Sequence, residues 1–200
     1  MGVYEETLAA NQQYAAGFGL GQLPMPPARK LAIVACMDAR LTVEQFLGLK
    51  TGEAHIIRNA GGLATDDALR SLIISTCLLG TRTIFVIEHT DCGMLTFRDE
   101  QLRQQLKSET GQETSHLDFH AFANLEENLR AQLRRIRENP FLPRDIELHG
   151  FIYDVRSGPP TGSPRRRRRG ACGQLEFSVK GAYRRAFAVS KSNRFLSWRS

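Results

Sequence analysis

The chain has 200 residues and a formal net charge of +6, and this length predicts one domain with a single core. It contains no run of 18 or more apolar residues, so we expect no helix that spans a membrane. The first residues, MGVYEE, are polar and acidic and lack the basic and apolar regions of a secretory signal, so we expect a cytoplasmic protein.

The positive charge comes from the C-terminal part of the chain. Residues 159–200 contain 11 Lys and Arg and one Glu, whereas residues 1–158 contain 16 basic and 20 acidic groups, a net charge of −4. We therefore expect a mildly acidic folded domain over residues 1–158, followed by a basic tail over 159–200 that is disordered or unrelated to the domain.

Apolar patterns and turn residues predict helices that alternate with strands. The expected helices are residues 3–18, a short helix from Thr42 to 48, 66–79, 93 to about 107, and 117–138. The expected strands are residues 31–36, 54–58, 83–88 and 146–155. This alternation predicts an α/β fold with a mainly parallel central sheet flanked by helices. The helix over 3–18 has few apolar positions, so we expect an arm that lies on another surface or subunit.

The helix over 66–79 has clear start and end signals. Thr65 is a suitable N-cap, Asp66 favours the positive end of the helix dipole, and Gly80 ends the helix. Cys77 lies among apolar residues of this helix, so we expect it in the core.

Polar side chains follow two of the apolar strands. Cys36, Asp38 and Arg40 come at the end of the first strand, and His89 and Cys92 follow the strand over 83–88. The carboxyl ends of parallel strands meet at one edge of a sheet, so these side chains should lie together. Two cysteines, a histidine and a carboxylate are enough for a four-coordinate zinc site. The alternative is two unrelated buried cysteines and a loop histidine.

Three motifs in this order resemble those of the β-class carbonic anhydrases: Cys36-x-Asp38-x-Arg40, then Arg58-Asn59-Ala60-Gly61, then His89-x-x-Cys92-Gly93. The stretch GFIYDV, residues 150–155, is similar to the last strand of that family. The resemblance covers about residues 4–158. It is closest to the small bacterial and archaeal branch, which also contains hydrolases of carbonyl sulfide and carbon disulfide.

The resemblance implies the β-carbonic anhydrase fold and one Zn²⁺ per subunit, held by Cys36, His89 and Cys92. The fourth position would be a water molecule or, in a closed state, Asp38. Asp38 and Arg40 would be catalytic, and zinc-bound hydroxide would convert CO₂ reversibly to bicarbonate and a proton. The expected substrate pocket is lined by Asn59, Ala60, Gly61, Gly62 and Gly93. The alternative for the 59–62 segment is an ordinary glycine-rich turn.

The family resemblance also implies a homodimer or a dimer of dimers, in which the N-terminal helix of each subunit lies on its neighbour.

Two other functions stay open. One is hydrolysis of carbonyl sulfide or carbon disulfide at the same zinc site. The other is a non-catalytic zinc domain whose tail binds polyanions through five arginines, residues 165–169. We do not expect specific nucleic-acid binding. Residues 173–179 could be a displaced half of a closing hairpin, or the whole segment after Gly158 could be a foreign extension.

Overall fold

The computed structural model describes residues 1–157 and 175–176. The predictions for the arginine run and for most of the tail lie outside these residues. The helices are α1 Val3–Ala16, α2 Val43–Leu47, α3 Asp66–Cys77, α4 Asp99–Thr110 and α5 Leu125–Glu138, with short 3₁₀ turns η1 Ala60–Gly62 and η2 Gly93–Leu95. The strands are β1 Leu31–Cys36, β2 Ala54–Asn59, β3 Thr83–His89, β4 Glu147–Tyr153 and β5 Leu175–Glu176.

The sheet has the order β2-β1-β3-β4-β5. The first four strands are parallel, and β5 pairs antiparallel with the end of β4. The predicted α/β class with a mainly parallel sheet is therefore confirmed. In this register Cys36 is the partner of Asn59, and His89 is the partner of Tyr153, so the predicted ligands lie at one edge of the sheet.

Both faces of the sheet carry apolar side chains, as the continuous apolar pattern of β1 predicts. All six residues of β1 are buried. On one face Ala32 and Val34 pack with residues of α3 and α5, including Leu72 and Leu129. On the other face Ile33 and Ala35 of β1 pack with α2 and with Phe151 of β4. The sheet thus holds the ends of β1 and β3 in a rigid setting.

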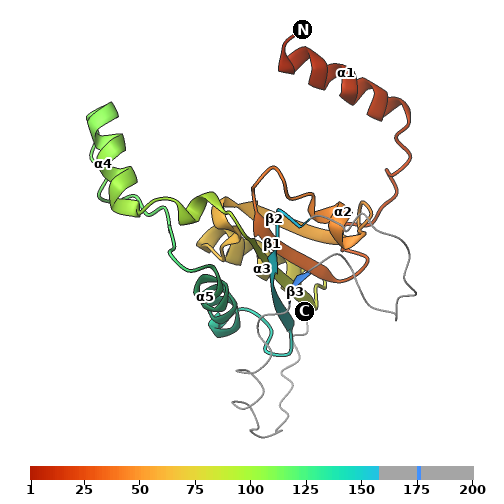
Figure 1. The fold of residues 1–200 in the computed structure, drawn as a ribbon. Helices are drawn as coiled ribbons and strands as arrows, with labels where there is room; N and C mark the ends of the chain where they lie inside the picture. The colour runs from red at the N-terminus through yellow and green to blue at the C-terminus, as the bar shows by residue number, and fades with distance from the viewer. Residues whose placement is uncertain (158–174, 177–200) are drawn as a thin grey trace, which may run out of the picture.

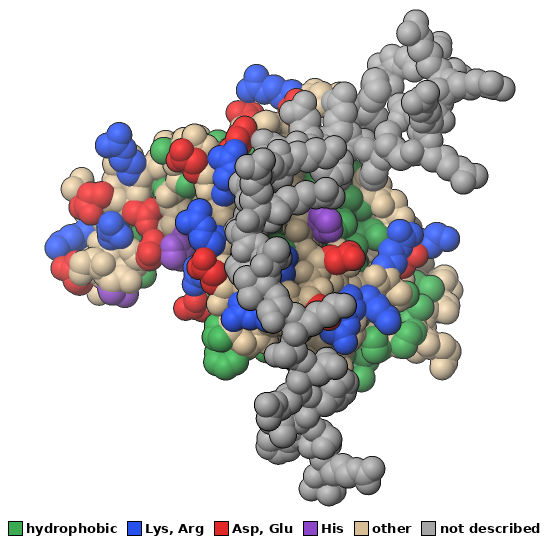
Figure 2. All heavy atoms as spheres, turned by 90° about the horizontal axis from the view of Figure 1, so that it is seen from below, with side chains coloured by type: hydrophobic (Ala, Val, Ile, Leu, Met, Phe, Trp, Pro, Cys, Tyr) green, Lys and Arg blue, Asp and Glu red, His purple; other side chains and the backbone are tan. Residues whose placement is uncertain are grey.

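Two helices extend away from this core (Figure 1). Neither α1 nor α4 has a buried residue. The helix predicted over residues 3–18 is present as α1, Val3–Ala16, with Val3 and Tyr4 more than 70% exposed, and its packing on another surface or subunit stays a prediction. On the face seen in Figure 2, side chains of Lys and Arg lie among those of Asp and Glu over the described residues. No helix in the described part of the chain is both long and apolar enough to cross a bilayer.

The helix predicted from residue 93 to about 107 is wrong as one element. Only the turn η2 forms at residue 93, because the Thr96 hydroxyl bonds the Gly93 carbonyl oxygen at 2.7 Å and Arg98 is extended (φ −116°, ψ 146°). The side chain of Gln101 accepts the Arg98 N–H at 2.9 Å, which starts a separate helix at Asp99.

The predicted start of the next helix at residue 117 is also wrong. The Asp99 carboxylate accepts hydrogen bonds from the backbone N–H groups of Phe119, His120 and Ala121 at 2.8–3.1 Å. His120 has φ 58°, a left-handed conformation that a helix cannot contain. The helix begins only after Asn124, whose side chain accepts the N–H of Glu127.

The expected core position of Cys77 is wrong, because its side chain is exposed. The buried face of α3 contains Leu72, Ser75 and Thr76, so the next residue turns outward. Thr65 does cap this helix, accepting the N–H of Ala68 at 3.4 Å. Thr42 occupies the N-cap position of α2, but its side chain makes no capping bond.

Candidate metal centre

Three side chains from two strand ends converge at the carboxyl edge of the sheet. The ligand atoms of Cys36, His89 and Cys92 all lie within 4.8 Å of one another, and all three residues are buried. The two sulfur atoms are 3.9 Å apart and do not form a disulfide. Two sulfurs bound tetrahedrally to one zinc at about 2.3 Å each would be about 3.8 Å apart, so the spacing fits zinc.

The histidine is oriented for metal binding. Its Nδ1 is 2.9 Å from the carbonyl oxygen of Thr90, and because a carbonyl only accepts, this nitrogen carries the proton. The lone pair is then on Nε2, which has no hydrogen-bond partner among the described residues although His89 is fully buried. A buried acceptor without a partner costs free energy unless something binds it. A metal ion would satisfy it.

The two thiols share one negative charge in the metal-free site. A hydrogen bond from Cys92, followed by contacts with His89 and the backbone N–H groups of Asp38 and Gly61, lowers the pKa of Cys36 to about 4 despite burial. The same hydrogen bond, together with burial, raises the pKa of Cys92. Burial opposes the charged imidazole, but the adjacent Cys36 and Asp38 and the Thr90 carbonyl raise the pKa of His89. Zinc would displace the remaining proton, since it binds thiolates.

Asp38 and Arg40 form a two-point ion pair beside these ligands. Nε and Nη2 of Arg40 donate to the two carboxylate oxygens at 2.9 and 2.8 Å, and the Arg40 backbone N–H donates at 2.9 Å. Oδ2 of Asp38 is 3.7 Å from Nε2 of His89. The Arg40 side chain holds the pKa of Asp38 far below its usual range, so the carboxylate is charged at neutral pH.

Arg58 holds the backbone of this loop. Its Nε donates to the carbonyl oxygen of Cys36 at 3.0 Å, and its Nη2 donates to that of Asp38 at 2.6 Å. In the sequence Arg58 stands out only as part of a motif, and this role was not predicted. No local signal could have shown it, because the contact joins β2 to the end of β1.

Of the residues expected to line a substrate pocket, Asn59 to Gly62 form a tight turn beside Cys36. The amide of Asn59 is used within the turn, where Oδ1 accepts the N–H of Leu63 at 2.7 Å and Nδ2 donates to its carbonyl at 2.8 Å. Gly61 and Gly62 are buried, whereas Gly93 is exposed. Cys36 and Cys92 belong to an apolar cluster whose other members are Leu41, Phe46, Ala60, Met94, Leu95, Phe97, Phe122, Tyr153 and Val155.

Glu88 is a buried acid that was not predicted as a site residue. It is 1% exposed, its Oε1 accepts from Asn128 at 2.8 Å, and its Oε2 has no partner among the described residues. Burial raises its pKa to about 8. An acidic residue inside the apolar run of β3 was the available signal.

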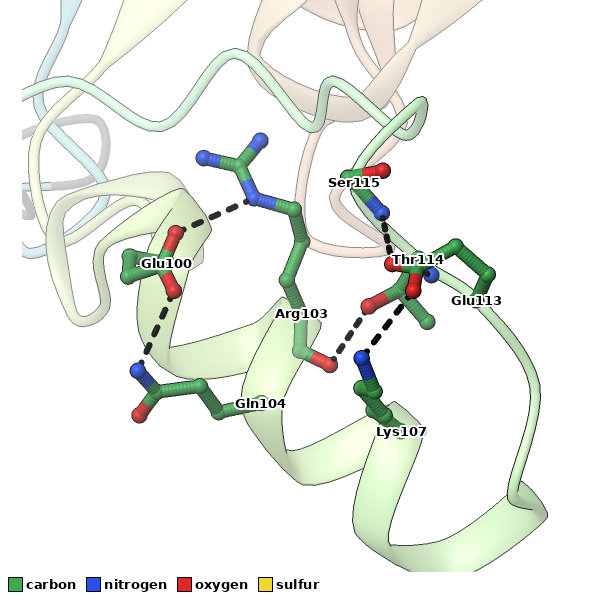
Figure 3. A pocket seen from close by; sticks show the side chains of 7 residues that line it. All are labelled: Glu100, Arg103, Gln104, Lys107, Glu113, Thr114 and Ser115. Carbon is green, nitrogen blue, oxygen red and sulfur yellow. Dashed lines mark hydrogen bonds and ion pairs between the residues drawn. The ribbon is translucent and has the colours of Figure 1, made fainter.

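Two cavities are present that none of Cys36, His89 and Cys92 lines. One, of about 390 Å³, is bounded by α4 and residues 113–115 (Figure 3). Its charged side chains pair with each other, Lys107 with Glu113 at 3.0 Å and Arg103 with Glu100 at 3.4 Å. The other, of about 540 Å³, lies by the start of α5 and Thr90. Neither is lined by a predicted site residue.

Comparison with known proteins gives one consistent family. Residues 31–159 match the family model described as carbonic anhydrase. The chain is 51% identical to β-carbonic anhydrase 1 of Mycobacterium tuberculosis over 158 residues, which cover 79% of this chain and 96% of the relative. It is 34% identical to a carbon disulfide hydrolase of Acidianus sp., covering 66% and 76%. The crystal structure of a carbonic anhydrase from Streptococcus mutans matches with a TM-score of 0.75 and 43% identity, covering 80% of this chain and 96% of the other.

Proposed function

The chain belongs to the β-carbonic anhydrase family, and we propose that it catalyses the reversible hydration of CO₂ to bicarbonate and a proton at a zinc ion held by Cys36, His89 and Cys92. One observation carries the zinc site: a fully buried imidazole nitrogen without a partner among the described residues lies beside two thiols that are 3.9 Å apart.

Each residue of the site has a proposed task. Zinc in such a site lowers the pKa of water to about 7 and so supplies a nucleophile at neutral pH. Asp38 accepts a hydrogen bond from the attacking water and orients it, because its carboxylate is charged and only 3.7 Å from the ligand atom of His89. Arg40 keeps this carboxylate in place through two hydrogen bonds. If Arg40 releases it, Asp38 can serve as the fourth metal ligand and close the site.

The turn over residues 59–62 and Gly93 is proposed to bound the substrate pocket. The apolar side chains around the cysteines, among them Met94 and Phe97, suit a nonpolar substrate such as CO₂. These residues would shape the space beside the metal without taking part in proton transfer.

The Asp38→Ala variant tests the assigned chemistry. We expect it to bind one zinc per chain, as the parent does, and to lose CO₂ hydration activity on the order of 10²-fold, because the water is no longer oriented. Zinc content would be measured by atomic absorption and hydration by stopped-flow with a pH indicator. Asp67→Asn, which changes an exposed carboxylate paired with Arg70 on α3, is the matched control. Parental activity in zinc-loaded Asp38→Ala would refute the role of Asp38.

The other two functions have weaker support. The carbon disulfide hydrolase of Acidianus sp. is 34% identical, compared with 51% for the mycobacterial carbonic anhydrase. Sulfide release from carbonyl sulfide or carbon disulfide, without CO₂ hydration, would favour the hydrolase. The ordered Asp38–Arg40 pair argues against a purely structural zinc site, which has no need of a second carboxylate beside its ligands.

We further propose a homodimer, or a dimer of dimers, in the cytoplasm. The exposed apolar side chains of α1, such as Tyr4, Leu8 and Tyr14, support an arm that packs on a second subunit. The division into a catalytic domain over 1–158 and a tail over 159–200 stays a prediction, as does the cytoplasmic location.

A further inference from the structure

Asp91 lies between the proposed ligands His89 and Cys92, and two arginines converge on it. Nη1 of Arg40 is 3.3 Å from its Oδ2, and Nη2 of Arg40 donates to its carbonyl oxygen at 3.0 Å. Nη2 of Arg156, which follows β4, is 3.4 Å from its Oδ1. The side chain and the backbone of Asp91 therefore bind the same guanidinium, and a second one binds the other carboxylate oxygen.

The backbone of Asp91 is suited to this contact. Its φ is 60°, one of three positive values among the described non-glycine residues. Asp and Asn adopt this left-handed conformation more readily than other residues with a side chain. The conformation lets the Asp91 carbonyl and carboxylate both receive hydrogen bonds from Arg40.

Asp38 and Asp91 do not compete for Arg40. Asp38 is bonded by Nε and by Nη2, whereas Asp91 is bonded by Nη1 and by Nη2, which has two hydrogens. The guanidinium therefore bridges the end of β1 and the turn after β3. Without Asp91 the Arg40 side chain, which is 47% exposed, would keep only its attachment to Asp38.

We propose that Asp91 is a positioning residue for the carbonic anhydrase reaction, one that fixes the Arg40 guanidinium and thereby keeps the Asp38 carboxylate paired with Arg40 rather than bound to the metal. This inference rests on the function proposed above. Asp91 acts through Arg40 and does not itself contact the reacting atoms. Because the Asp91 and Arg40 side chains are about half exposed, we expect replacement of Asp91 to change guanidinium proton exchange and kcat only modestly, roughly two- to fivefold.

The first test follows the Arg40 side chain itself. Asp91→Asn removes the charge and Asp91→Gly removes the side chain, and both replacements tolerate a positive φ. In zinc-free protein labelled with ¹⁵N-arginine, with the Arg40 signal assigned by its loss in Arg40→Lys, we expect solvent exchange of the guanidinium protons to rise roughly two- to fivefold, more in Asp91→Gly. Asp67→Asn should leave the signal unchanged. Unchanged exchange in both Asp91 variants would overturn the inference.

The second test asks whether Asp91 acts through Asp38. In zinc-loaded protein, Asp91→Asn should lower kcat roughly two- to fivefold with KM nearly constant. The same change in an Asp38→Ala background should have no effect on the residual kcat, because nothing remains to be positioned. An equal loss in both backgrounds would overturn the inference and leave only a structural role. An inactive zinc-loaded parent would instead overturn the proposed function, and the role of Asp91 with it.

Discussion

Gly62 lies where the turn after β2 meets the ends of β1 and β3, at the base of the metal site. A Cβ added there would be 2.8 Å from the backbone nitrogen of Cys36 and 3.0 Å from the carbonyl oxygen of Ile87, and its φ is 71°. Neither neighbour can move away, because both belong to the sheet. The position therefore requires glycine for both space and backbone conformation.

Gly62→Ala is expected to destabilise the fold. The left-handed conformation costs a non-glycine residue about 1–2 kcal/mol and the overlap roughly 1–3 kcal/mol more. Urea unfolding of zinc-free protein measures the loss. Gly17→Ala is the control, because Gly17 has φ −103° and a Cβ added there would meet nothing within 4 Å. Equal stabilities of the two variants would contradict the close approach of Gly62.

The buried Glu88 predicts a pH dependence of stability. Its pKa is about 8 in the folded chain because burial disfavours the charged form, whereas the ordinary value is 4.5. The folded chain thus holds this proton more tightly than the unfolded chain. The contribution of Glu88 to stability is complete below pH 4.5 and is lost as the pH rises through about 8.

Glu88→Gln should therefore weaken the decline in stability between about pH 5 and about pH 8.5. The free energy of unfolding of zinc-free protein would be measured at both pH values for parent and variant, with the exposed Glu6→Gln as control. The gain from Glu88→Gln should be larger at the higher pH than at the lower one. A gain of the same size at both would show that Glu88 does not titrate in this range.

At the scale of elements, one carboxylate binds three consecutive residues of the segment between α4 and α5. The Asp99 carboxylate accepts hydrogen bonds from the backbone N–H groups of residues 119–121. Burial alone would raise its pKa, but the N–H groups of Ala121 and Phe119 outweigh it and lower the pKa. The stabilising contribution of Asp99 is therefore present above its ordinary pKa of 3.8 and is lost as the pH falls below it.

Asp99→Asn should loosen residues 119–121 and lower the free energy of unfolding by about 1–3 kcal/mol. The reason is that an amide oxygen replaces a charged acceptor of three hydrogen bonds. Hydrogen exchange at residues 119–121 should become faster in the variant, and thermal unfolding should occur at lower temperature. Asp145→Asn, an exposed change near the start of β4, is expected to alter neither. Unchanged exchange at 119–121 would refute the anchoring role of Asp99.

The two helix boundaries missed from the sequence are both set by side chains that bond backbone groups, through bonds three residues apart near residue 96 and through distant bonds at residues 119–121. Residues 93–107 and 117–124 have helical composition, but their backbone groups are bonded by side chains such as Thr96 and Asp99. The Asp99 bonds join residues 20–22 positions apart. Local propensity does not contain such contacts, whereas the start of α3 depends on Thr65, three residues from its partner.

For the whole molecule, α1 offers a test of assembly. No residue of α1 is buried, so deleting residues 2–16 should change the free energy of unfolding of one subunit by little. If α1 packs on a second subunit, the deletion should convert the proposed dimer to monomer, as measured by analytical ultracentrifugation. Leu129→Ala, a core change in α5 expected to cost about 2–5 kcal/mol, is the contrasting control. A truncated chain that stays dimeric would exclude α1 as the dimer contact.

The sequence by itself determined the fold class and predicted that the proposed metal ligands lie together. The apolar run of β1, and the runs that precede the other motifs, predicted parallel strands, and the parallel arrangement places Cys36 near His89 and Cys92 although 53 residues separate the first two. Strand periodicity and chain order are local properties, so the sequence contains them.

Only the tertiary structure decided how the site is held. Arg40 contacts Asp91, which is 51 residues away in the chain, and Arg58 contacts the loop after β1 from a neighbouring strand. The packing also turned Cys77 outward, since a single helix face lies on the sheet. These outcomes depend on which side chains meet after the sheet has formed. Their physical reason is packing and hydrogen bonding between distant segments, which no local pattern specifies.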